Sequence, residues 1–270
     1  MVLEYLVGLL LGVIIGIIAT LIGVGGGFLY VPCLIYICGL EPRIAIGTSI
    51  SIILFTTLSG SIAYLRQKRV FFRSALCLIV PSMIFSVLGA WSTIYISDRL
   101  LAIIFSLVLL MIRIKMIVPT LPIVSPITHG PYHDESLRDF SSMNVKNRLY
   151  YFHTSAWGAI AGFMSGLTGI GGGIINVPAL VIGGMPVHFA IATSTAVILF
   201  TSISATFTHM RLGNISLPHV AVFSAGAIVG AQIGARIAPG VNSDKLKSAI
   251  GILLLLTSVS VLLQNSGLIP

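Results

Sequence analysis

A glycine-rich segment occurs twice in this chain, each time between two apolar runs. Residues 23–34 read GVGGGFLYVPCL and residues 169–180 read GIGGGIINVPAL, so seven of the twelve positions are identical. Glycine frees the backbone, whereas a membrane interior accepts irregular backbone only where protein or a water-filled cavity surrounds it. A repeated break between apolar segments therefore constrains the fold more than any other feature of the sequence.

The composition is that of a polytopic membrane protein. Only 8% of the 270 residues are charged, 56% are hydrophobic and the mean hydropathy is +1.07, which leaves too few polar residues to cover a water-soluble domain. The first twelve residues contain no Lys or Arg and include Glu4, so we expect no cleaved signal peptide. The basic residues flank apolar runs and form no aromatic-interleaved cluster, which argues against nucleic acid as a partner.

The apolar runs follow one order in both halves of the chain, which predicts an all-α fold. Runs of spanning length can cross a hydrocarbon core of about 30 Å, whereas the run after each glycine segment is too short to do so. We therefore expect about 8–10 membrane segments, including a half-length helix after each glycine break. The expected segments are 5–22, 28–40, 44–65, 74–96 and 100–118, then 151–167, 174–187, 189–210, 217–237 and 246–263.

A polar stretch divides the chain into two membrane repeats. Residues 119–150 are rich in proline and charged residues, so apolar burial and helix propensity both fall there. The predicted organisation is a first repeat at 1–118, a polar cytoplasmic linker at 119–150 and a second repeat at 151–270.

The distribution of basic residues predicts that the second repeat is inverted relative to the first. With five segments per half, twelve of the fifteen Lys and Arg residues lie on one side, and with four per half only ten do. Basic residues concentrate on the cytoplasmic side, which favours five. An odd number inverts the second half, an arrangement with which transporters place a binding site near mid-membrane.

The two glycine segments are candidate donors to an anion. A glycine turn at a helix start presents unpaired N–H groups and the positive end of the helix dipole. Close helix packing is the alternative role of such glycines. Nearby hydroxyls either donate to the anion or cap free amides, and Asn176, which replaces Tyr30, donates either to a ligand or to another helix. The candidate residues are Gly25, Gly26, Gly27, Thr48, Ser49, Gly171, Gly172, Gly173, Asn176, Thr193 and Ser194.

Other kinds of site find no support in the sequence. No nucleotide-binding glycine pattern is present, the three cysteines form no metal or disulfide pattern, and we expect neither a cofactor nor an enzyme. All seven acidic residues map to segment ends or loops, which leaves no intramembrane carboxylate for ion coupling. His188, His209 and His219 map to segment edges, where we expect ordinary solvated side chains.

The repeated G-[IV]-G-G-G-x-[LI]-x-V-P-x-L, with A-x-[GA]-T-S after each copy, resembles the TauE/SafE family of sulfite exporters and anion permeases. The resemblance implies ATP-independent transport of small sulfur-containing oxyanions, such as sulfite, sulfonates or sulfoacetate, across the cytoplasmic inner membrane. Tyr30 and the long linker depart from the family pattern. The alternative is a non-transporting membrane subunit or chaperone. The oligomeric state stays open, with a homodimer as one option.

Overall fold

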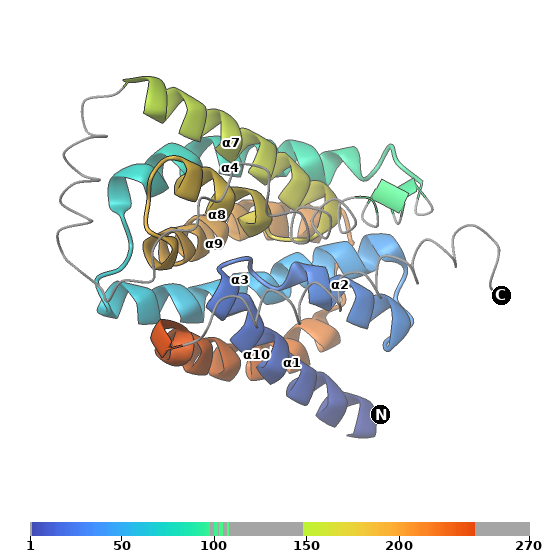
Figure 1. The fold of residues 1–270 in the computed structure, drawn as a ribbon. Helices are drawn as coiled ribbons and strands as arrows, with labels where there is room; N and C mark the ends of the chain where they lie inside the picture. The colour runs from blue at the N-terminus through green and yellow to red at the C-terminus, as the bar shows by residue number, and fades with distance from the viewer. Residues whose placement is uncertain (1, 98–99, 102, 105–106, 108–147, 241–270) are drawn as a thin grey trace.

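The computed structural model describes residues 2–97, 100, 101, 103, 104, 107 and 148–240. The secondary structure of this part is helical (Figure 1). The helices are α1 (Val2–Ile22), α2 (Gly27–Tyr36), α3 (Pro42–Arg66) and α4 (Phe72–Ser92), then α7 (Arg148–Thr168), α8 (Gly173–Ile182), α9 (Val187–Arg211) and α10 (Leu217–Ile237), with a short 3-10 turn at Ala238–Gly240. The linker at 119–147, the segment 246–263 and most of 100–118 lie outside the described residues.

The helices repeat in length as well as in order. Helices of 21, 10, 25 and 21 residues occur in each half. The expected boundaries agree with the observed ones within a few residues, except that the two short helices end earlier, at Tyr36 and Ile182. A glycine with positive φ follows each of them, Gly39 at +64° and Gly184 at +91°, and turns the chain toward the next helix.

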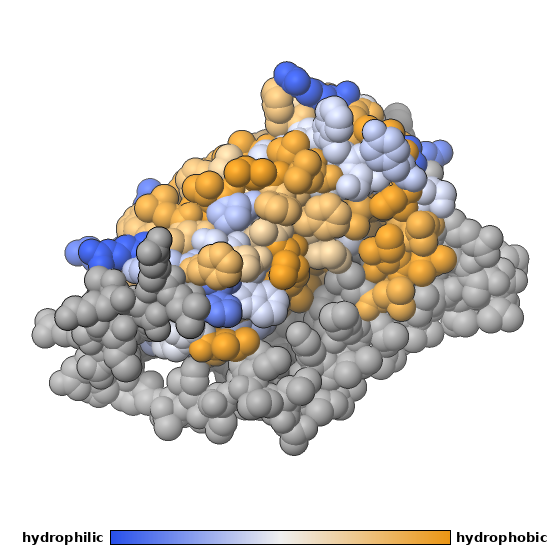
Figure 2. Space-filling view, turned by 90° about the horizontal axis from the view of Figure 1, so that it is seen from above, coloured by the Kyte–Doolittle hydropathy of each residue, from blue (hydrophilic) through white to orange (hydrophobic). Residues whose placement is uncertain are grey.

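Five of the described helices are long and apolar enough to cross a membrane: α1, α3, α4, α9 and α10. Large apolar side chains also cover much of the surface. Leu76, Val80 and Ile84 lie on one stripe of α4, and each exposes more than half of its area. Figure 2 shows hydrophobic residues over most of the described surface on one face, with the strongest hydrophilic colours mainly at its margins. Such a surface suits contact with lipid.

The two halves exchange their fourth helix. Helix α10 packs along α1 and α3, whereas α4 packs along α7 and α9, and α3 contacts α9 between the two groups. One group therefore contains α1, α2, α3 and α10, and the other contains α7, α8, α9 and α4 (Figure 1). Each group joins helices from both halves, so neither half of the sequence forms a separate bundle.

Small residues bring the exchanged helices into backbone contact. A Cβ added at Gly16 of α1 would lie 2.6 Å from the Ala227 carbonyl oxygen of α10. At the matching position, a Cβ on Gly162 of α7 would meet the Ser82 carbonyl oxygen of α4. Helices in membranes commonly approach this closely at small residues. The same contacts occur at equivalent positions, which ties the two halves to one packing plan.

Candidate anion-binding site

The two glycine turns lie against each other where the two helix groups meet. A Cβ added at Gly27 would meet the Gly169 carbonyl oxygen, and one added at Gly173 would meet the Gly23 carbonyl oxygen. Both turns therefore touch the opposite turn through backbone atoms. Gly27 and Gly173 therefore serve close packing, because no side chain fits at either position.

Left-handed backbone precedes each short helix. The φ angles are +90° and +91° at Gly25 and Gly26, and +95° and +74° at Gly171 and Gly172. Only glycine adopts this region readily, which explains why glycine occupies all four positions. The turn ends α1 or α7 and directs the chain into α2 or α8.

Each turn also presents buried N–H groups. The N–H groups of Leu29 and Tyr30 donate to the Gly26 carbonyl at 2.9 and 3.0 Å, and α8 starts in the same way at Gly172. The preceding N–H groups, at 25–28 and 171–174, have no acceptor among the described residues. Residues 25–28 and 171–173 are buried. Buried N–H groups without partners are rare, and at a helix start they are candidate donors to an anion.

Ser49 and Ser194 hold the turns in place. The Ser49 hydroxyl donates to the Gly169 carbonyl at 2.9 Å, and the Ser194 hydroxyl donates to the Gly23 carbonyl at 2.8 Å. Both serines are fully buried. A hydroxyl has one hydrogen, so these two have none left to donate to an anion. The structure thus brings both predicted serines to the glycine turns, where they position the backbone.

Thr48 and Thr193 lie one residue earlier and reach the exchanged helices. The Thr48 hydroxyl oxygen accepts the Ser216 N–H at 2.9 Å, at the start of α10. The Thr193 hydroxyl oxygen accepts the Phe71 N–H at 3.0 Å, at the start of α4. These two predicted residues therefore anchor the helix exchange.

Asn176 lies in the first turn of α8 and is 1% exposed. Its Oδ1 atom is buried and has no hydrogen-bond partner among the described residues. Tyr30, the matching residue of α2, is also buried but pairs its hydroxyl with the Thr56 hydroxyl at 3.3 Å. The two turns are therefore alike in backbone and different in this side chain.

Sequence reasoning missed two isoleucines that line both turns. A Cβ added at Gly25 would lie 3.2 Å from Ile53 Cγ2 and 3.3 Å from Ile198 Cγ2, and the same two residues flank Gly171. Both are fully buried. Ile53 and Ile198 hold matching positions after the two Thr-Ser pairs, and this repetition is the sequence feature from which they could have been predicted. They make the surroundings of the turns apolar and so strengthen any electrostatic interaction there.

The expectation for His209 is wrong. This residue is completely buried, with Nε2 at 2.9 Å from the Gly166 carbonyl oxygen and Nδ1 without a partner among the described residues. The last turn of α9 meets α7 there, so the edge of an apolar run is an interior position. At the matching place, Tyr64 donates its hydroxyl to the Thr20 carbonyl at 2.7 Å. His188 and His219 are partly exposed.

Comparison with known proteins gives the family. The model described as "Sulfite exporter TauE/SafE" matches residues 8–265. Probable membrane transporter protein YunE of Bacillus subtilis is 28% identical over 97% of this chain and 98% of its own length. Probable membrane transporter protein MJ0441 of Methanocaldococcus jannaschii is 26% identical over 88% of each chain. No solved structure matches. With its apolar helices, this chain is a multi-pass membrane protein and belongs to the sulfite exporter TauE/SafE family.

Proposed function

We propose that the protein carries a small sulfur-containing oxyanion, of the sulfite, sulfonate or sulfoacetate type, across the cytoplasmic membrane without ATP. The observation that carries this proposal is the pair of glycine turns, whose buried N–H groups have no acceptor among the described residues. An anion in apolar surroundings needs compensating dipoles or charge. Backbone dipoles provide it without a fixed positive charge, which favours release as well as binding.

The matched contacts support an inverted repeat as the transport scaffold. Ser49 and Ser194 make the same hydrogen bond across the contact between the turns, and Thr48 and Thr193 make matching bonds to the exchanged helices. Two equivalent turns that meet at a pseudo-two-fold axis suit alternating access, since either helix group can then open toward one side. The five-segment halves inferred from the basic residues complete this proposal.

One observation favours a different function. Gly27 and Gly173 pack directly against backbone of the opposite turn, as glycines do when their only role is close packing. In a non-transporting membrane subunit or chaperone, both turns would serve packing alone. The two functions differ in a measurable way, because only a transporter moves the anion through a bilayer.

Flux into proteoliposomes tests the proposal. Purified protein is reconstituted without ATP, and uptake of labelled sulfite is measured against protein-free liposomes, with unlabelled methanesulfonate and sulfoacetate as competitors. We expect saturable sulfite uptake that a competitor of this class reduces. Uptake equal to that of protein-free liposomes, for labelled sulfite, methanesulfonate and sulfoacetate alike, would refute the transport function.

A further inference from the structure

The two repeats differ around the first turn of their short helices. We infer that the side chains in contact with the anion come from the second repeat only, from Asn176 and Ser165, whereas the first repeat carries Tyr30 in the place of Asn176. This inference rests on the proposed transport function and adds where the substrate binds and which side chains contact it.

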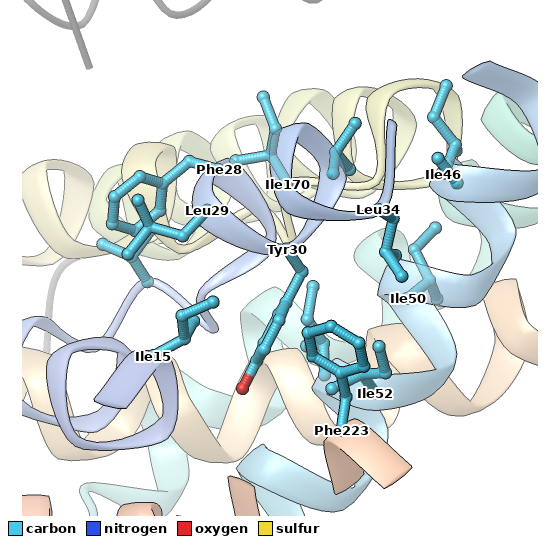
Figure 3. Packing of buried hydrophobic residues seen from close by; sticks show 14 of the residues in the cluster. Ile15, Phe28, Leu29, Tyr30, Leu34, Ile46, Ile50, Ile52, Ile170 and Phe223 are labelled. Atoms are coloured by element: carbon cyan, nitrogen blue, oxygen red, sulfur yellow. The ribbon is translucent and has the colours of Figure 1, made fainter. Parts of the chain in front are cut away.

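The place in the first repeat is occupied by an aromatic ring. Tyr30 extends from α2 into the space between Ile15 and Phe223 (Figure 3), and its ring meets the Phe223 ring edge-on at 6.4 Å between centroids. A Cβ added at Gly26 would lie 2.9 Å from Ala19 Cβ and 3.0 Å from Tyr30 Cε2, so Ala19 and Tyr30 are neighbours. This side is closed by apolar packing, and its one hydroxyl is paired with Thr56.

The matching place in the second repeat has smaller and more polar residues. The shared positions follow from the repeat, which aligns Gly23 with Gly169 and Thr48 with Thr193. The counterparts of Tyr30, Ala19, Ile15 and Phe223 are Asn176, Ser165, Ala161 and Leu78, in that order. Both aromatic rings are lost, the side chains in the places of Tyr30, Ile15 and Phe223 are smaller, and a serine replaces Ala19. At Gly172, the counterpart of Gly26, the three atoms nearest to an added Cβ all belong to Ala161, so Asn176 does not reach this glycine as Tyr30 reaches Gly26.

Two of these aligned positions carry polar groups that have no partner among the described residues. Ser165 and Asn176 are each 1% exposed, and neither the Ser165 hydroxyl nor Asn176 Oδ1 has a hydrogen bond among the described residues. Thr168, three residues after Ser165 on the same helix, donates to the carbonyl of the preceding turn at 2.6 Å. The Ser165 hydroxyl makes no such bond to the preceding turn of its helix. Buried polar groups without partners cost free energy, which a ligand would recover.

The chemistry of these groups favours an anion. The Asn176 amide can turn so that Nδ2 replaces Oδ1, since the two atoms differ only in their hydrogen bonds. The amide and the Ser165 hydroxyl then both donate, and the free N–H groups at the start of α8 add the positive end of the helix dipole. A cation here would face the positive end of the α8 dipole, and α4, α7, α8 and α9 contain no carboxylate to offset it. The ligand class is thus a small oxyanion.

The neighbouring helix extends this polar character. The Ser86 hydroxyl of α4 lies 2.7 Å from the Ser204 hydroxyl of α9, and the Ser86 carbonyl oxygen faces Gly166, next to Ser165. The first repeat has Ala231 in the place of Ser86. The asymmetry therefore includes the exchanged helix as well as the short one.

Sulfite flux into proteoliposomes tests the assignment through two variants, Asn176→Leu and Ser165→Ala. We expect KM to rise about tenfold in the first and about threefold to tenfold in the second, the loss of one or two donors to a charged ligand. Thermal stability without sulfite should not fall, because each change removes a polar group that lacks a partner. The rise in Tm that sulfite gives the parent should shrink in both variants.

Two controls separate binding from packing. Ser224→Ala removes another buried hydroxyl without a partner among the described residues, on α10, and Tyr30→Phe removes the hydroxyl of the first repeat while keeping its ring. Both should keep the parent KM. If the parent moves no sulfite, the proposed function itself fails. If the parent moves sulfite and the Asn176 and Ser165 variants keep its KM, or if Tyr30→Phe raises KM equally, only the one-sided site is refuted.

Discussion

Replacing Ser49 or Ser194 with alanine should destabilise the fold rather than weaken substrate binding directly. Each hydroxyl donates to a carbonyl of the opposite glycine turn, at 2.9 and 2.8 Å, and both serines are fully buried. Truncation removes a hydrogen bond worth about 0.5–1.5 kcal/mol and leaves a buried carbonyl without that partner. Hydrogen bonds between membrane helices average about 0.6 kcal/mol, and this value sets the lower end of the expected loss of stability. We expect a loss of about 1–2 kcal/mol in either variant, equal within error because the two bonds are equivalent.

Unfolding in mixed detergent micelles measures this loss. The protein is titrated with sodium dodecyl sulfate, and tryptophan fluorescence reports the free energy of unfolding for the parent and each variant. Ser92→Ala is the matched control, because its exposed hydroxyl also donates to a carbonyl at 2.8 Å but within its own helix, to Leu88. Exposed substitutions of this kind change stability by about 0.5 kcal/mol or less.

The opposite outcome has a clear meaning. Donation to the anion was one of the two roles that the sequence left open for both serines, and in that role truncation would raise the Kd for sulfite without a stability loss in its absence. Ser49→Ala and Ser194→Ala proteins as stable as the Ser92→Ala control, but with weakened sulfite binding, would refute the positioning role.

Three further changes test other parts of the structure. Gly27→Ala should abolish a monodisperse peak in size-exclusion chromatography, because the added Cβ has no space. Gly39→Ala, with φ of +64° and open surroundings, should lower the free energy of unfolding by only about 1–2 kcal/mol and keep the peak. Equal behaviour of the two variants would contradict the turn packing. His209→Leu should lower Tm, since it removes a buried hydrogen bond, and an unchanged Tm would show that this bond contributes nothing. Single cysteines replacing Lys68 and Gly213, at matching helix ends, should react with an impermeant maleimide from opposite sides of the membrane; labelling from one side would refute the inverted repeat.

The local features of the fold could be predicted from the sequence. Apolar runs, glycine breaks and prolines are properties of neighbouring residues, and they gave the described helices nearly to their ends. The exchange of α4 and α10 could not be predicted, because the contact between Gly16 and Ala227 joins positions in different repeats. The buried position of His209 was missed for the same reason, since its burial comes from α7 and not from its own segment.

Some candidate residues are identical in the two halves of the chain, and others differ. The residues that hold the glycine turns, Ser49 and Ser194, are identical in both halves, because both turns need the same support from the opposite backbone. Substrate contact carries no such requirement, since one anion bound at the contact between the turns can be held from a single side. Tyr30 and Asn176 differ between the repeats, and so do Ala19 and Ser165; Ser165 was not predicted because serine is common in membrane helices. If the inferred contacts hold, departures from the repeat at buried polar positions mark the substrate contacts, and the repeated motif marks the scaffold that holds the turns.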